Sequence, residues 1–145
     1  MARFYDIDAA NALIPEVRDI LAALRDQRAE LIRLRDAALE RSTSVEATAG
    51  EGGRSGGADP AAADDEVRVM RLRMQGVVDQ MQAGVARLVE LDITLRDIES
   101  GLIDFPALVN GRPVWLCWRL GEDDVVWWHE LSTGFGSRRP LIELE

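Results

Sequence analysis

The stretch GLIDFPALVNGRPVWLCWRLGEDDVVWWHEL, residues 101–131, holds all four tryptophans, the only cysteine and the only histidine of the 145-residue chain. Its apolar residues recur with a period of two, which is typical of β-strands with one buried face. Asn110-Gly111 is a strong short signal for a β-hairpin, and GEDD at 121–124 suits a second turn. We therefore expect a small three-stranded antiparallel β meander, with strands near 102–109, 112–120 and 125–131.

The pairing register of the last two strands decides which side chains share a face. With a four-residue second turn, Trp118 lies across from Trp127, and Cys117 lies on the face opposite to His129. We prefer this register because it gathers apolar side chains on one face that would pack on helices: Leu116, Trp118, Leu120, Val125, Trp127 and Leu131. A one-residue shift would reverse the relation, and a bulged turn would place Cys117 across from His129.

Two helical segments precede this stretch, because apolar residues recur in alternating steps of three and four over 7–41 and 67–99. Asp6 is placed to accept hydrogen bonds from the first turn. Pro15 removes a backbone donor, so we expect a kink or a short separate helix there. The similar lengths predict a long, coiled-coil-like antiparallel helical hairpin, and the fold class is α+β, mainly α.

Residues 42–66 connect the two segments and are dense in glycine, serine, alanine and acid. They have almost no large apolar side chain with which to offset the entropy of ordering, so we expect a disordered loop. Residues 132–145 form a tail after the aromatic β module at 101–131. We expect the whole chain, 1–145, to be a single domain.

Composition excludes several classes of partner. The net charge is −9, and no block of basic residues is present, so we expect neither nucleic acid nor a membrane as partner. One cysteine permits no internal disulfide, and no apolar run approaches the length of a membrane span. We expect a cytoplasmic protein.

Apolar residues also lie outside the two periodic patterns, and two helices alone cannot cover them. We therefore predict a homodimer in which two hairpins form a four-helix bundle. The residues concerned are Ile14, Leu21, Ile32, Val69, Leu72, Val78, Val85, Val89 and Ile93.

Two stretches carry a resemblance to a known family. These are FYDIDAANALIP near the start and GLIDFPALVNGRPVWLCWRLGEDDVVWWHELSTGFGSRRPL toward the end. With them the chain resembles the bacterial domain-of-unknown-function 2203 family, and the Gly/Ser-rich loop is an unmatched insertion. The resemblance supports the architecture, and it implies no reaction, because the family carries no established activity.

Cys117 and His129 are the side chains best suited to metal binding or nucleophilic catalysis. A metal site would combine them with Glu130, Glu122 or Asp104, but the short paired spacings typical of zinc ligands are missing. A catalytic thiol–imidazole pair requires the bulged register and an exposed thiol of low pKa. We prefer a packed cysteine and a hydrogen-bonded histidine, with no metal, no cofactor and no catalytic residue.

Polar residues beside the tryptophans are candidates for binding. They form either a ligand or peptide site or a salt-bridge network that holds the hairpins, and we prefer the network. The arginines after the turn at 132–137 would suit a phosphate or carboxylate, although a surface turn is the simpler interpretation. The candidates are Arg119, Glu122, Trp128, His129, Glu130, Arg138 and Arg139.

The preferred function is a non-catalytic structural or protein-interaction module. The alternative is a metal-dependent or thiol-based enzyme or binding protein centred on Cys117, His129 and Glu130. The register of the second hairpin discriminates between them: Cys117 and His129 on one exposed face favour chemistry, and opposite faces favour a scaffold.

Overall fold

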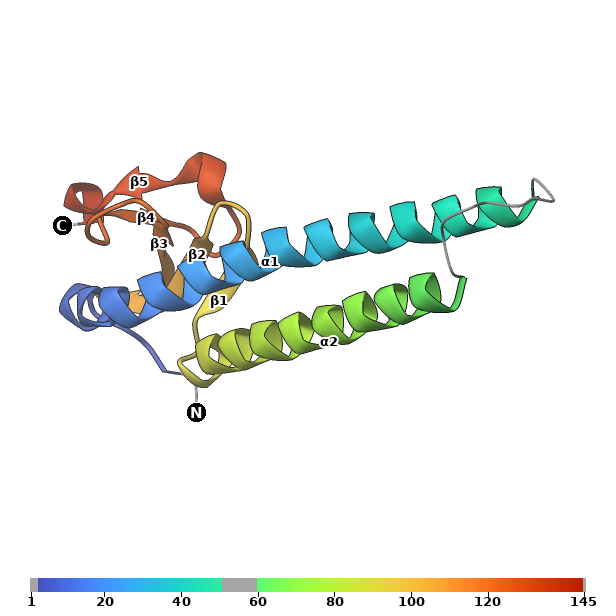
Figure 1. Cartoon of the computed structure of the whole chain (residues 1–145). Helices are drawn as coiled ribbons and strands as arrows, with labels where there is room; N and C mark the ends of the chain where they lie inside the picture. The colour runs from blue at the N-terminus through green and yellow to red at the C-terminus, as the bar shows by residue number, and fades with distance from the viewer. Residues whose placement is uncertain (1–2, 51–59, 145) are drawn as a thin grey trace. The chain divides into compact units, whose positions relative to one another are not determined.

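The computed structural model describes residues 3–50 and 60–144 as two helices followed by a five-stranded antiparallel sheet (Figure 1). The helices are α1 (Ile7–Gly50) and α2 (Pro60–Glu90). The strands, in sheet order, are β1 (Thr94–Asp97), β2 (Leu102–Val109), β3 (Arg112–Arg119), β4 (Trp127–His129) and β5 (Arg139–Pro140). Two short 3-10 helices, η1 (Phe135–Ser137) and η2 (Leu141–Leu144), flank β5. The α+β class is confirmed, but the prediction of three strands is wrong.

The chain divides into two compact units. One comprises Met1–Asp26 with Gln82–Glu145, and the other comprises Gln27–Met81. The first unit holds the sheet, the start of α1 and the end of α2, and the second is purely helical within its described residues. No helix in the described parts of the chain is long and apolar enough to cross a membrane.

The second helix ends at Glu90, so its predicted extent to residue 99 is wrong. Asp92 adopts a left-handed conformation with φ 58°. Its N–H donates to the carbonyl of Val89, and the N–H of Ile93 donates to the carbonyl of Leu88, which is the Schellman pattern of a helix end. The apolar spacing that continues through Leu95 belongs to β1, whose pairing adds an edge to the sheet.

The predicted loop at 42–66 is shorter than expected, because α1 continues to Gly50 and α2 begins at Pro60. Alanine and glutamate have high helix propensity, and proline is well suited to a first helical position. Residues 51–59, the glycine-rich centre of the predicted loop, lie outside the described residues. In the helical unit, Arg41 Nε lies 2.8 Å from Glu66 Oε2 and pairs the two helices.

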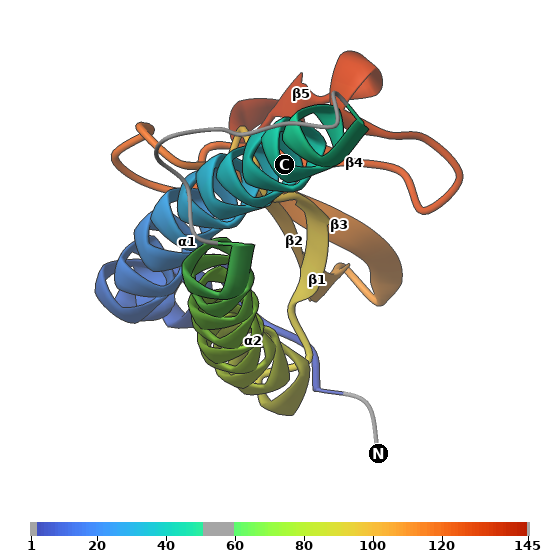
Figure 2. The ribbon, with the colours of Figure 1, turned by 45° about the vertical axis from the view of Figure 1, so that its right-hand side comes forward.

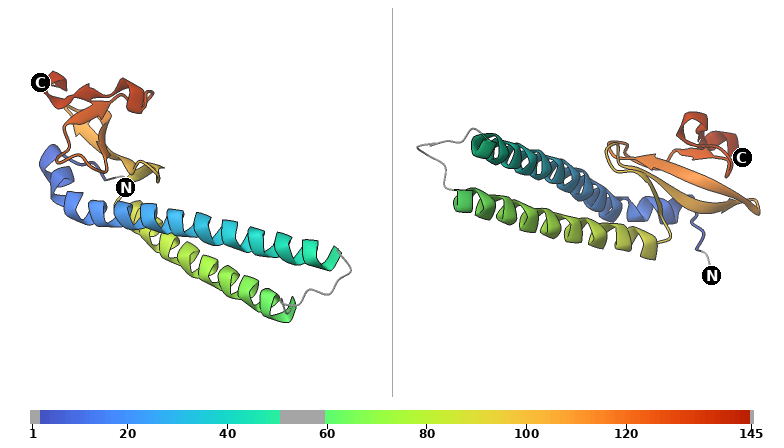
Figure 3. Two further views of the ribbon diagram at one scale, coloured as in Figure 1. Left: turned by 45° about the horizontal axis from the view of Figure 1, so that its top comes forward. Right: turned by 90° about the vertical axis from the view of Figure 1, so that its right-hand side faces the viewer.

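The start of α1 follows the sequence prediction. Asp6 Oδ1 accepts a hydrogen bond of 2.7 Å from the N–H of Ala9, which confirms Asp6 as the N-cap. Pro15 lies inside a continuous helix. Figure 3 shows the first turns of α1 inclined to the rest of the helix, as expected where proline removes a backbone hydrogen bond.

One face of the sheet packs against the start of α1 (Figures 1 and 2). The guanidinium of Arg18 lies over the Trp118 ring, and Asn11 Oδ1 accepts a hydrogen bond of 2.7 Å from the N–H of Val125. The buried residues on the helix are Ala10, Ile14, Val17, Leu21 and Leu24. Those on the sheet are Ile103, Phe105, Ala107, Val114, Leu116, Trp118 and Trp128. The core of the first unit therefore lies between α1 and the sheet.

The β2–β3 hairpin forms as predicted. Asn110 and Gly111 both have positive φ, as a tight two-residue hairpin turn requires. Pairing runs from Leu102 opposite Arg119 to Val109 opposite Arg112 without a shift. This register places Asp104 directly opposite Cys117.

The preferred register of β3 and β4 is wrong by one residue. Cys117 pairs with Trp127, and Trp115 pairs with His129, so Cys117 and His129 share a face. Trp128, rather than Trp127, joins the core side. Between the strands, the connecting loop contacts α1, because the N–H of Val125 donates to Asn11 and the Val125 side chain is buried.

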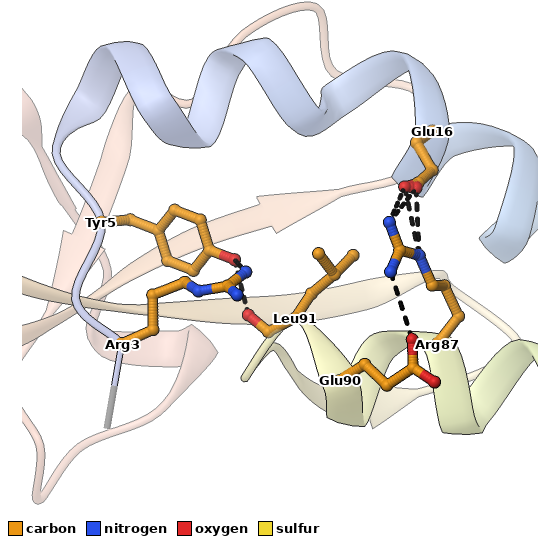
Figure 4. Close-up of polar contacts among 6 residues, drawn as sticks. All are labelled: Arg3, Tyr5, Glu16, Arg87, Glu90 and Leu91. Carbon is orange, nitrogen blue, oxygen red and sulfur yellow. Dashed lines mark hydrogen bonds and ion pairs between the residues drawn. The ribbon is translucent and has the colours of Figure 1, made fainter. Parts of the chain in front are cut away.

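The residues before α1 are attached to the end of α2, as Figure 4 shows. The Tyr5 hydroxyl donates a 2.5 Å hydrogen bond to the carbonyl of Leu91, and its ring packs edge-on against Phe105. Arg87 joins α2 to α1 through both carboxylate oxygens of Glu16. Within the first unit, these contacts connect α1, the end of α2 and β2.

Candidate functional site

Three neighbouring strands bring Asp104, Cys117 and His129 together on the sheet face opposite to the α1 core. Asp104 on β2 lies across from Cys117 on β3, and His129 on β4 lies on the same face. One carboxylate oxygen, the thiol sulfur and one ring nitrogen all lie within 4.8 Å of one another. All three residues are buried, with exposed fractions of 1–2%. A carboxylate, a thiol and an imidazole so close together form a potential metal site.

The two oxygens of Asp104 have different surroundings. Oδ2 accepts a 2.8 Å hydrogen bond from Nε of Arg96 and lies 3.0 Å from Nε2 of His129. Oδ1 is buried and has no hydrogen-bond partner among the described residues. An unpartnered carboxylate oxygen away from water is costly, so Oδ1 is an atom to which a cation would bind favourably.

His129 has an oxygen near each of its ring nitrogens. Nδ1 lies 2.8 Å from the carbonyl oxygen of Glu130, which can only accept, so a hydrogen on Nδ1 would be donated to it. Nε2 then faces the Asp104 carboxylate, another acceptor. A neutral ring has one N–H, so it donates to only one of the two oxygens, and a cation between Nε2 and the carboxylate would satisfy the other contact.

The thiol of Cys117 is not activated for nucleophilic attack. Burial, and after it the negative charge of Asp104, raises the pKa of the Cys117 thiol from 9.0 to about 12. A thiol of this pKa is protonated near neutral pH and is a poor nucleophile. The arrangement therefore does not support the thiol-based catalysis considered from the sequence. A bound metal would replace the thiol proton, as metals do when they bind cysteine.

The cluster opens onto a pocket of about 230 Å³. Asp104, Cys117 and His129 form part of its wall together with Arg96, Leu102 and residues 131–135. A site with three protein ligands and an adjoining cavity leaves a position for a further ligand, which is the arrangement of catalytic rather than structural zinc sites.

Glu130, predicted as an oxygen ligand, does not contribute its carboxylate to the cluster. That carboxylate pairs with the guanidinium of Arg112 across β3 and β4. The contribution of Glu130 is its backbone carbonyl, which holds the His129 ring. Glu122, the other acid considered, pairs with Arg138 at 2.7 Å. Asp104 is therefore the acidic residue that the structure places with Cys117 and His129.

The remaining binding candidates form structural contacts. Arg138 is largely buried and stacks over the Trp127 and Phe135 rings, while Arg119 stacks over Phe135. Arg139 lies over the buried Trp128 ring. Each of these arginines therefore contacts an aromatic ring, and Arg138 also pairs with Glu122.

Arg96 is the residue of the site that sequence reasoning missed. It was placed on the second helix, whereas it lies on β1 and reaches Asp104 on the neighbouring strand. Arg96 could have been found only if the end of α2 before residue 94 had been recognised. The sequence marks that end only by Asp92, a residue type that tolerates positive φ.

Comparison with known proteins extends over almost the whole chain. The family model described as an uncharacterized conserved protein (DUF2203) matches residues 3–141, which include all three residues of the cluster and Arg96. Neither the curated proteins nor the solved structures contain a significant match. Because the family match covers far more than half of the sequence, the chain belongs to the DUF2203 family.

Proposed function

We propose that the protein binds a divalent transition metal of the zinc class through Asp104, Cys117 and His129. The observation that carries the proposal is Asp104 Oδ1, which is buried without a partner beside a thiol and an imidazole. From the sequence we preferred a scaffold without metal. Cys117 and His129 share a face, as the metal-binding alternative requires, although that face is buried rather than exposed, and we now favour this alternative.

The donor atoms determine the class of metal. A sulfur, a nitrogen and an oxygen ligand suit zinc and its neighbours better than magnesium or calcium, which prefer oxygen. Tetrahedral zinc holds its ligand atoms about 3.4 to 3.8 Å apart, as its bond lengths require. One carboxylate oxygen, the sulfur and one ring nitrogen lie within 4.8 Å of one another, which is near the separation that a shared ion requires.

Further contacts orient two of the proposed ligands. Arg96 holds Oδ2 of Asp104, which leaves Oδ1 for the metal. The carbonyl of Glu130 holds Nδ1 of His129, which leaves Nε2 for the metal. Metal-binding histidines and carboxylates are commonly held in this way by a second hydrogen bond.

A cobalt titration tests the proposal. Chelator-treated protein is titrated with Co²⁺ while its ultraviolet and visible absorption is recorded. Because the chain has one cysteine, a thiolate-to-cobalt absorption band reports Cys117 alone. We expect a band that saturates at one equivalent and is absent from Cys117→Ser. Glu130→Gln is the matched control and should retain the band, since its carboxylate pairs with Arg112. Wild-type protein without a saturable band would overturn the proposal.

The helices support a separate proposal, namely that the protein forms a homodimer. Several large apolar side chains are well exposed, among them Leu72 at 66%, Leu39 at 60% and Val69 at 45%, all in the helical unit. Burial of such side chains against a second copy would be favourable. Light scattering should give twice the mass of the chain at micromolar concentration, and a monomer at that concentration would contradict the dimer.

A further inference from the structure

We infer that the open side of the metal site binds the carboxylate group of a small organic acid that carries a short apolar chain. The inference rests on the proposed metal site and specifies its ligand. It is carried by the charge around the site, by the position of Arg96 and by the apolar part of the pocket wall.

The charge around the filled site favours an anion. A divalent cation and Arg96 together contribute three positive charges, whereas Asp104 and a metal-bound Cys117 thiolate contribute two negative ones. Glu122 and Arg138 neutralise each other nearby. The net positive charge lies beside a buried cluster, where electrostatic interactions are stronger than in water.

Arg96 is positioned to recognise a carboxylate. Its Nε is used by Asp104, and its guanidinium lies over the Trp115 ring at 5.1 Å. These two contacts fix the guanidinium plane, while the side chain keeps 41% of its surface exposed and lines the pocket. A guanidinium has five N–H donors, so the terminal nitrogens can bind a ligand carboxylate in addition to Asp104.

The pocket wall favours an organic anion over phosphate. Leu102, Leu131 and Phe135 contribute apolar side chains to it. The guanidinium groups of Arg119 and Arg138 both contact the Phe135 ring, at 5.3 and 4.6 Å from its centre. A fixed apolar wall beside a cationic centre is complementary to a carboxylate with a hydrocarbon chain, and phosphate has no apolar part to bury there.

The apolar wall leads to a quantitative expectation. Burial of a methylene group contributes ~0.8 kcal/mol, which corresponds to about a fourfold increase in affinity. Affinity should therefore rise from acetate to butyrate to hexanoate, by up to about fourfold per methylene, until the chain leaves the pocket. Inorganic phosphate should bind more weakly than butyrate.

The test uses the full-length protein at saturating Co²⁺, in which the visible absorption of the metal reports a change of its ligands. Titration with acetate, butyrate, hexanoate and inorganic phosphate should give spectral changes whose midpoints follow the expected order. Arg96→Gln, also saturated with Co²⁺, should bind butyrate at least about tenfold more weakly, as expected for the loss of a charged hydrogen-bond donor. Phe135→Ala should retain acetate binding and reduce the gain with chain length.

The two proposals fail in different ways. Without a thiolate-to-cobalt band the metal site itself is refuted. With the band present, spectra unchanged by every carboxylate would refute the carboxylate inference alone. Phosphate binding at least as tight as butyrate binding, or equal affinity for all chain lengths, would also refute it.

Discussion

Two polar clusters in the sheet-containing unit differ in how their carboxylates are satisfied. Glu122 accepts hydrogen bonds on both oxygens, from the backbone of Arg119 and from the guanidinium of Arg138. Asp104 has partners on one oxygen, and its other oxygen is buried with none among the described residues. The Glu122 carboxylate is therefore complete within the chain, although Nε of Arg138 is buried without a partner in the described parts of the chain, whereas the Asp104 carboxylate is incomplete. A complete ion pair indicates a structural role, whereas an incomplete buried cluster beside a pocket indicates a binding site.

Loss of a metal ligand should have the largest effect. Residues that only orient ligands typically change metal affinity about 10- to 100-fold. We therefore expect His129→Ala to weaken zinc binding by more than about 100-fold, measured by competition with a chromogenic chelator. Glu122→Gln, which alters only the complete cluster, should bind zinc as the wild type does. If His129→Ala weakened zinc binding by less than about tenfold, the two clusters would not differ in metal binding.

Loss of the Glu122 charge should lower the free energy of unfolding and leave metal affinity unchanged. Glu122→Gln leaves the largely buried Arg138 guanidinium without its charged partner. Breaking such a pair costs more than losing a surface salt bridge, and we expect about 2 kcal/mol less free energy of unfolding in urea. Glu143→Gln, at an exposed residue, is the control and should change stability little. Equal stability of the two variants would show that the Glu122–Arg138 pair does not hold the fold.

The effect that is smallest near neutral pH concerns the thiol of the incomplete cluster in metal-free protein. Its pKa is raised in the folded state from 9.0 to about 12, so the folded state favours the protonated thiol. The resulting stability is fully present below pH 9 and is lost as the pH rises from 9 toward 12. Relative to Cys117→Ala, the wild type should lose about 1 kcal/mol of unfolding free energy per pH unit over the lower part of that range. Parallel pH profiles for the two proteins would contradict the assigned environment of the thiol.

Features fixed by neighbouring residues were predictable from the sequence. Asn110-Gly111 set the β2–β3 hairpin, and Asp6 set the start of α1. Two other features could not be predicted from neighbouring residues, namely the end of α2 and the register of β4. The end of α2 follows from a left-handed Asp92, a conformation that the surrounding apolar spacing conceals. The loop before β4 is bonded to α1 through Asn11 and Val125, which are 114 residues apart, so the register of β4 forms beside a contact that local sequence does not reveal.

The sequence predicted which side chains form the site, but it did not predict that they lie together on one face. Cys117, His129 and Asp104 were candidates because of their chemistry. Their shared face followed only from the observed register. Arg96 was missed because β1 was taken for helix, and the carboxylate of Glu130 was assigned to the cluster although it pairs with Arg112. Pairing between strands decides such contacts, and a single sequence specifies it weakly when several registers bury similar apolar surface.

The central claim is that Asp104, Cys117 and His129 together bind one metal ion, and X-ray absorption spectroscopy of the zinc-loaded protein tests it most directly. We predict one sulfur at about 2.3 Å and a shell of nitrogen and oxygen at about 2.0 to 2.2 Å, with four ligands in total. The sulfur should disappear in Cys117→Ser, since no other cysteine is present. A shell of oxygen and nitrogen alone in the wild type would show that zinc binds elsewhere and would contradict the claim.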